Sequence, residues 1–268
     1  MVTVTVLNLK GGVGKTSTCH HVGGTLARMG YRVLLLDNDP QASLTQGLLG
    51  PAAVDALMAW ESVASLYDPV TVPVPAALVR PSGIEGLWLV PGSPLATPFN
   101  VLPADRWPEL ETGIRSFLGR ASDDFDVCLV DNPPNLHLCS RASLVASDGL
   151  VVPLQAEDYG AQGLRPVMAA LESAREVNPT LRLLGLLVTM FDARLGIHQA
   201  YDTLLRESYG ASVFATRIPL AKDFKEAVAS RLPISHYKPK AAAAKATRAV
   251  ADELVSRAGL LGREGVAA

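Results

Sequence analysis

Cysteine is scarce in this chain, and long hydrophobic runs are missing from it. Its 268 residues include only Cys19, Cys128 and Cys139, with no Cys-x-x-Cys pair. So sparse and odd-numbered a set argues against a disulfide framework and indicates a reducing compartment, which we expect to be the cytoplasm. No apolar run approaches the roughly 20 residues that span a bilayer. The N-terminus also lacks the charged start, apolar block and cleavage site of a signal peptide.

A strong charge of either sign is also missing from the chain as a whole. Lys and Arg number 24 and Asp and Glu 26, which leaves a formal net charge of −2. The average conceals an asymmetry, because residues 219–268 hold nine basic and five acidic residues while residues 1–218 hold 15 and 21. Hydrophobic residues make up 49% of the chain, which is enough for a core and excludes a disordered protein.

Apolar runs that are typical of strands alternate with helical segments along most of the chain. We expect helices over residues 16–29, 107–119, 162–177, 198–209, 222–230 and 241–258. We expect strands over Val2–Leu7, Arg32–Leu36, Leu87–Val90, Val127–Val130, Gly149–Val152, Leu183–Val188 and Val213–Ile218. This alternation predicts an α/β fold with a mostly parallel, doubly wound sheet and helices on both faces.

Residues 51–108 break the alternation. They hold ten of the 19 prolines, and proline removes a hydrogen-bond donor and fixes φ. We therefore expect an irregular segment without long helices, packed on the rest of the molecule. Residues 1–268 would then form one domain.

A glycine-rich loop follows the first expected strand. It matches the phosphate-loop pattern G-x-x-x-x-G-K-[ST], except that Leu9 stands at the first glycine position. Glycines let backbone N–H groups surround phosphate oxygens, and the helix that follows adds the positive end of its dipole. Lys15 would reach the β- and γ-phosphates and the Thr16 hydroxyl would bind Mg²⁺. The nucleotide-binding residues predicted here are Gly11, Gly12, Val13, Gly14, Lys15, Thr16 and Ser17.

Two aspartates stand at the ends of apolar strands, where ligands bind in open α/β sheets. Asp37 follows the second strand, and Asp131 follows Val127–Val130. Four apolar residues and then Asp are typical of the residue that binds Mg²⁺ through water in phosphate-loop NTPases. Taken alone, Asp-Asn-Asp-Pro at 37–40 also fits an ordinary turn.

Several segments together resemble one family. Residues 10–16, Lys-Gly-Gly-Val-Gly-Lys-Thr, resemble the deviant Walker A loop of the ParA/MinD ATPases, and the chain looks like a ParA/Soj-type partition ATPase. Residues 37–41 and 131–134 resemble its switch I and switch II motifs, and residues 151–155 and 189–194 resemble two later segments. The resemblance covers nearly the whole chain.

The resemblance implies roles for individual residues. Lys10 would cross a dimer interface to the partner subunit's phosphates. Asp39 would position or polarise the attacking water, and Asp37 would support Mg²⁺ and its waters. The adenine would lie near Met190 and Pro219.

Candidate DNA contacts come from two sources. The resemblance places Arg194 at a DNA-contacting position. The residues themselves show Lys222 with Lys225, and Lys245 with Arg248, at i, i+3 spacing on expected helices. Such faces suit sequence-independent phosphate contacts, although a solvated helical face is the alternative. Leu220 and Asp223 depart from the family, whose members often carry arginines there.

The function that follows is an ATP-dependent switch with ATP and Mg²⁺ as cofactors. The protein would dimerise with ATP, bind nucleoid DNA without sequence preference, and hydrolyse ATP when a ParB-like or other cargo-adaptor partner stimulates it. The cargo, whether plasmid, chromosome or another assembly, stays open. Because the first strand starts at Val2, we expect no N-terminal helix-turn-helix domain.

Three other functions remain as alternatives. A MinD-like ATPase would act at a membrane surface, but Val255–Ala268 lacks the wide apolar face of a membrane anchor, so no membrane partner is expected. A nitrogenase-iron-protein-like electron-transfer ATPase needs two cysteine ligands per subunit. Cys139 could supply one, but no cysteine lies between residues 20 and 127 to supply the other. A non-enzymatic scaffold would not need Lys15, Thr16, Asp39 and Asp131 intact.

Overall fold

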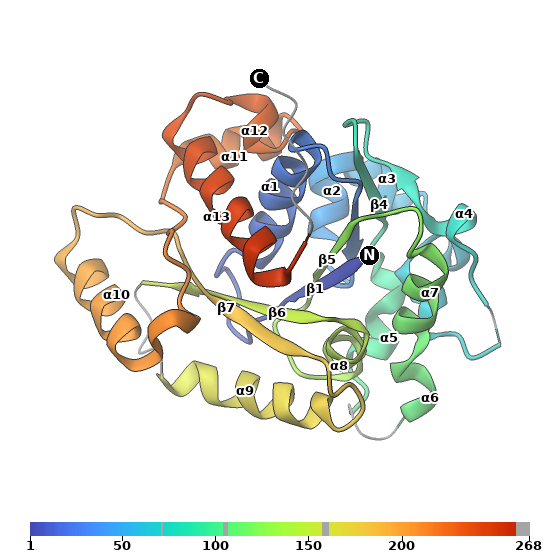
Figure 1. Ribbon diagram of the computed structural model, residues 1–268. Coiled ribbons are helices and arrows are strands. Elements are labelled where there is room, and N and C mark those ends of the chain that lie inside the picture. The colour runs from blue at the N-terminus through green and yellow to red at the C-terminus, as the bar shows by residue number, and fades with distance from the viewer. Residues whose placement is uncertain (71, 104–106, 157–160, 261–268) are drawn as a thin grey trace.

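A seven-stranded sheet forms the centre of the computed structural model, which describes all residues except 71, 104–106, 157–160 and 261–268 (Figure 1). The strand order is β3-β4-β2-β5-β1-β6-β7. All neighbouring strands are parallel except β3 and β4, which pair antiparallel at one edge. The strands are β1 (Val2–Val6), β2 (Val33–Asp37), β3 (Arg80–Pro81), β4 (Leu87–Val90), β5 (Val127–Asp131), β6 (Gly149–Gln155) and β7 (Arg182–Thr189).

Helices cover both faces of this sheet (Figure 1). The longer ones are α1 (Lys15–Arg28), α7 (Gly113–Ala121), α8 (Leu138–Ala146), α9 (Ala161–Arg175), α10 (Gly196–Tyr209), α11 (Lys222–Ala229) and α13 (Ala242–Ala258). The shorter ones are α2 (Ser43–Leu49), α3 (Pro51–Asp55), α4 (Pro75–Leu78), α5 (Thr97–Asn100), α6 (Pro108–Glu111) and α12 (Ile234–Tyr237). The described residues also include the 3₁₀ turns η1 (Ala59–Glu61), η2 (Val63–Tyr67), η3 (Pro94–Ala96) and η4 (Gly210–Ser212). None of the described helices is long and apolar enough to cross a membrane.

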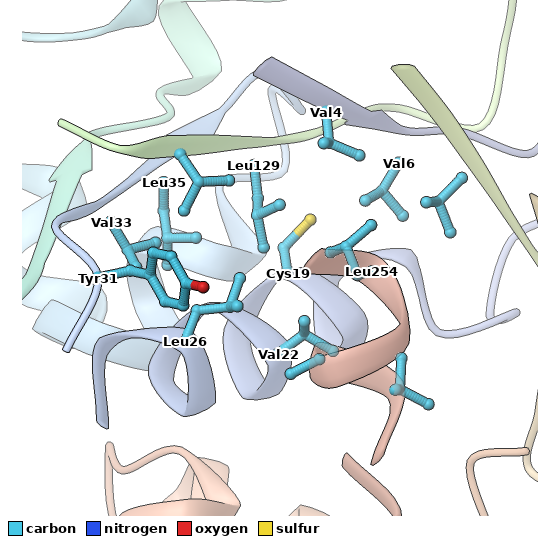
Figure 2. Close-up of a cluster of buried hydrophobic side chains, with 14 of the residues drawn as sticks. Val4, Val6, Cys19, Val22, Leu26, Tyr31, Val33, Leu35, Leu129 and Leu254 are labelled. Carbon is cyan, nitrogen blue, oxygen red and sulfur yellow. The ribbon is translucent and has the colours of Figure 1, made fainter. Parts of the chain in front are cut away.

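The core lies in layers on either side of the sheet because side chains alternate along each strand. On β2, Leu35 packs with helices α1 and α13, whereas Leu34 and Leu36 pack on the opposite face with η2, α7 and α8. Figure 2 shows the first of these layers, in which Cys19, Val22 and Leu26 of α1 and Leu254 of α13 meet Val4, Val33, Leu35 and Leu129 of the strands. The predicted doubly wound, mostly parallel sheet is therefore confirmed.

One expected strand is wrong. Residues Val213–Ile218 form no strand, although Val213 makes an isolated bridge with Leu186 and the N–H groups of Phe214 and Ile218 donate to carbonyl oxygens of β7. The backbone N–H groups of Ala215 and Thr216 donate instead to the carboxylate of Glu253 on α13. These two N–H groups are therefore not available for a continuous ladder with β7.

The proline-rich segment 51–108 contains only short elements, as its composition predicts. Its inner residues join the core, since Leu66, Tyr67 and Leu78 are buried with Leu34 and Leu36 of β2. The helix expected over 107–119 is divided into α6 and α7. The break lies at Thr112, and α7 begins at Gly113, where an added Cβ atom would come within 1.8 Å of the Leu66 carbonyl oxygen.

Candidate active site

The glycine-rich loop joins β1 to α1 at the carboxyl edge of the sheet. Gly12 and Gly14 have φ angles of 78° and 88°, in the left-handed region that side chains disfavour. Gly14 is the residue at which α1 begins, so the loop leads directly into the positive end of that helix. Local sequence thus produces the loop that the motif predicted.

Side chains from the neighbouring strands hold the loop's carbonyl groups. The Gln155 amide donates to the Gly12 carbonyl oxygen at 3.1 Å, and the Thr189 hydroxyl donates to that of Val13 at 2.8 Å. Both side chains stand at strand ends, Gln155 on β6 and Thr189 on β7. With these carbonyls fixed to the sheet, the loop has the form of an anion site built from backbone amides. The sequence showed these two residues as parts of motifs but did not reveal this role.

Lys15 lies at the start of α1 with only 7% of its surface exposed. Its ammonium group donates to the carbonyl oxygen of Lys10 at 3.1 Å. Burial lowers the pKa of Lys15, while Asp131 and Asp39 act against that shift. The structure therefore places a partly desolvated cation inside the loop, where phosphate oxygens would stabilise it.

The Lys10 backbone is fixed, while its side chain is exposed. Its N–H donates to Asn8 Oδ1 at 3.0 Å, and the Asn8 amide donates to the Pro153 carbonyl oxygen at 2.7 Å. The loop is thus anchored through Asn8 to Pro153 of β6, and the Lys10 side chain lies at the surface.

Asp37 and Asp131 end adjacent parallel strands and are register partners. Both are completely buried, and each leaves one carboxylate oxygen without a hydrogen-bond partner. Burial raises the pKa of both groups, and Asp37 raises that of Asp131 further by repulsion. The Thr16 side chain lies beside Asp131 and acts against the rise in the pKa of Asp131. Two carboxylates and a hydroxyl fit Mg²⁺, which prefers oxygen ligands and usually takes only one or two carboxylates from the protein.

A second set of contacts orients the Asp37 carboxylate. Its Oδ2 atom accepts hydrogen bonds from the backbone N–H of Thr45 at 2.8 Å and the Thr45 hydroxyl at 2.6 Å. That hydroxyl oxygen accepts in turn from the N–H of Gly92 at 2.8 Å. A Cβ atom at Gly92 would lie 2.6 Å from the Asp37 carboxyl carbon, so glycine is needed for this close approach. Neither Thr45 nor Gly92 carries a motif that would have revealed it.

Asp39 lies just beyond Asp37 and is half-buried. Its Oδ1 atom accepts the backbone N–H of Gln41 at 2.9 Å. Burial raises the pKa of Asp39, and the nearby Lys15 opposes this shift. A half-buried carboxylate close to the loop lysine is placed to accept a hydrogen bond from water.

An open cavity of about 580 Å³ adjoins the loop. The predicted base-binding residues Met190 and Pro219 both line it, together with Gly14 and Ser17. Met190 has a positive φ of 52°, and its sulfur accepts the Gln155 amide at 2.9 Å. The cavity is large enough for a nucleoside. Lys225, which the sequence indicated as a DNA contact, also lines it.

The predicted DNA-binding residues lie on three elements, and all five side chains are exposed. Arg194 stands before α10 and binds Asp192 at 2.7 Å, Lys222 on α11 lies 3.4 Å from Glu226, and Arg248 on α13 binds Asp252 at 3.1 Å. Lys245 lies one helical turn before Arg248. Pairing with carboxylates reduces the positive charge around Arg194, Lys222 and Arg248. A count of basic residues does not show these pairs.

Comparison with known proteins agrees with this geometry. The loop, the two strand-end aspartates and the sheet order define a phosphate-loop nucleotide hydrolase. A family model described as an AAA domain matches residues 1–183. The chromosome-partitioning ATPase Soj of Thermus thermophilus is 35% identical over 257 residues, 95% of each chain, and the chromosome partitioning protein ParA of Caulobacter vibrioides is 31% identical over 94% of this chain and 93% of its own. The chain belongs to the ParA/Soj family of chromosome-partitioning ATPases, as its motifs predicted.

A solved structure gives the same picture. Cobyrinic acid a,c-diamide synthase of Mycobacterium smegmatis, with bound ADP and magnesium, has a TM-score of 0.79 and 28% identity over 99% of this chain and 98% of its own.

All three cysteines of the present chain are buried and unpaired. Cys139 is therefore enclosed in the core and does not present a cluster ligand at the surface.

Proposed function

We propose that this protein binds ATP with Mg²⁺ and hydrolyses it as the timing step of a partition system. The observation that carries the proposal is the meeting of Lys15, Asp37, Asp39 and Asp131 at one edge of the sheet. These residues come from three separate segments, the start of α1, the end of β2 with the loop that follows it, and the end of β5. No structural need of the core explains two fully buried carboxylates with unpartnered oxygens.

Each residue would have a distinct part in the reaction. The loop amides and Lys15 bind the phosphates and stabilise the charge that develops on them. Thr16, Asp37 and Asp131 would hold Mg²⁺, which neutralises phosphate charge when it is bound. Asp39 orients the attacking water. Met190 and Pro219 enclose the base.

The exposed side chain of Lys10 supports a role outside its own subunit. Its backbone is part of the loop, but its ammonium group belongs to the surface next to the nucleotide. We infer that ATP joins two copies face to face, with each Lys10 reaching the other copy's phosphates.

The dimer would then bind DNA. Because two basic surfaces act together, the second contact is effectively intramolecular and binding rises steeply. Arg194, Lys222, Lys225, Lys245 and Arg248 are the proposed contacts. A ParB-like or other cargo adaptor would stimulate hydrolysis and release the protein, which would work in the cytoplasm on the nucleoid.

Light scattering of the Asp39→Ala protein tests the proposal. With ATP and Mg²⁺ this variant should form a stable dimer, because it binds ATP but cannot complete hydrolysis. The matched control is Asp124→Ala, an exposed aspartate at the opposite edge of the sheet, which should hydrolyse ATP like the wild type. A persistent monomer at high protein concentration, or wild-type hydrolysis by Asp39→Ala, would contradict it.

A further inference from the structure

The two acidic motifs carry an asparagine at matching places. Asn38 follows Asp37 on β2, and Asn132 follows Asp131 on β5. The backbone N–H of Asn38 donates to the Asp131 carbonyl oxygen at 2.9 Å, so the two strand ends are joined directly. The side chains also meet, with Asn38 Nδ2 at 3.3 Å from Asn132 Oδ1.

The Asn38 side chain connects more than these two motifs. Its amide nitrogen donates to the Cys139 carbonyl oxygen and to the Ser143 hydroxyl, both at 2.8 Å and both on α8. Its amide oxygen accepts the Tyr67 hydroxyl at 2.7 Å. Asn38, Asn132, Tyr67 and Ser143 are completely buried. The donors and the acceptor of the Asn38 amide are thus all engaged, which fixes its orientation.

We propose that Asn38 is a positioning residue for ATP hydrolysis and that Tyr67 sets its orientation. A buried amide is costly unless every polar atom is paired, and a leucine could fill this space without that cost. Asn38 immediately precedes Asp39, so a rotation of its backbone moves the Asp39 carboxylate. The inference rests on the proposed role of Asp39 in orienting water.

Tyr67 links this network to the proline-rich segment. Its ring stacks on Phe99 of α5 with centroids 5.2 Å apart. The next residue, Asn100, accepts a hydrogen bond from the Asn135 amide at 3.2 Å, just after the second motif. The segment 51–108 therefore contacts the first motif through Tyr67 and the residue that follows the second motif through Asn100, and the network assigns it a part in hydrolysis besides covering the core.

Tyr67→Phe is the most direct test because it removes one hydroxyl and keeps the stacked ring. We expect the single-turnover rate of ATP hydrolysis to fall roughly tenfold, since small displacements of a reacting group have large effects. The ATP dissociation constant should stay within about twofold, because the loop and Lys15 are untouched. The control is Tyr31→Phe, a buried tyrosine in the core layer on the opposite face of the sheet, which should leave both values unchanged.

A double-mutant cycle separates positioning from simple loss of stability. Asn38→Ala should reduce the rate at least as much as Tyr67→Phe, and the double variant should be no slower than Asn38→Ala, because the hydroxyl acts only through the amide. If Asn38→Ala does not fold, the Tyr67→Phe rate decides alone. A wild-type rate in Tyr67→Phe, or an equal loss of ATP affinity, would overturn the inference. The proposed function would still stand, since it is tested separately by dimerisation and hydrolysis of the Asp39→Ala protein.

Discussion

The ammonium group of Lys15 lies 3.1 Å from the carbonyl oxygen of Lys10, so the two lysines of the glycine loop meet within one subunit through side chain and backbone. The contact occupies Lys15 with a neutral acceptor and leaves the Lys10 side chain at the surface. The two lysines therefore have different environments, and their substitution should have different consequences.

Lys15→Ala should abolish nucleotide binding in practice. It removes the buried cation that is proposed to face the phosphates, and a charge-assisted contact of this kind contributes enough to weaken binding about a hundredfold. Isothermal titration with ATP and Mg²⁺ checks this expectation. The control is Lys240→Ala, an exposed lysine between α12 and α13, which should bind ATP normally.

Lys10→Ala should separate nucleotide binding from assembly. Because the substitution keeps the Lys10 backbone and its contacts with Asn8 and Lys15, the monomer should keep ATP affinity within a few-fold, whereas the ATP-dependent dimer should disappear. Titration and light scattering on the same sample measure both. If Lys10→Ala in the Asp39→Ala background dimerises fully with ATP, Lys10 does not cross the interface.

Stability should depend on pH through His20. Burial lowers the pKa of His20 to about 4 from an ordinary value of 6.5. Between these values the unfolded state binds more protons than the folded state, so the free energy of unfolding falls as the pH falls, by up to about 3 kcal/mol.

The raised pKa of Asp37 acts in the opposite direction, so a comparison with His20→Gln is needed to isolate the histidine. Urea unfolding between pH 4 and 7 should show a smaller loss of stability toward low pH in His20→Gln than in the wild type. The exposed His137→Gln should follow the wild type. Equal slopes in all three proteins would show that His20 does not titrate as proposed.

Two glycines of α7 should respond oppositely to alanine. At Gly113 the new Cβ atom would come within 1.8 Å of the Leu66 carbonyl oxygen, so we expect a loss of about 2 kcal/mol or more. At Gly119 nothing lies within 4 Å, and alanine favours the helix by about 0.5–1 kcal/mol. Thermal unfolding should therefore place Gly119→Ala above the wild type and Gly113→Ala below it.

Sequence predicted the parts of the site that are continuous along the chain. The loop at residues 11–16 and the aspartates at strand ends need only local geometry, and they lie where expected. Contacts between distant segments carry no such signal. Thr45 and Gly92 bind Asp37 or its partner, and nothing in their neighbourhoods indicates it.

Two segments differ from the sequence prediction, helix α8 and residues 213–218, and the differences have related causes. Helix α8 was not expected because seven of its nine residues are buried, which removes the alternation of polar and apolar faces. The segment 213–218 is apolar and β-like, but Glu253, nearly 40 residues later, binds its backbone. In both cases tertiary contacts override the local pattern.

Basic surface residues should control DNA binding without affecting assembly. Arg194→Glu, and Lys222→Glu with Lys225→Glu, should abolish DNA binding while ATP still drives dimerisation. Because Lys225 lines the cavity beside the glycine loop, its variant also needs a separate ATP titration. The control is Arg115→Glu, an exposed position on α7. DNA binding by Arg194→Glu at the wild-type level would remove Arg194 from the contact surface.

The most direct test of the account is DNA binding by the wild-type protein, measured on unrelated sequences with ATP, with ADP and without nucleotide. We predict binding with ATP alone, equal for all sequences, and a linear fall of log affinity with log salt concentration. Equal binding in all three nucleotide states would contradict the switch, and no binding in any state would contradict a role on the nucleoid.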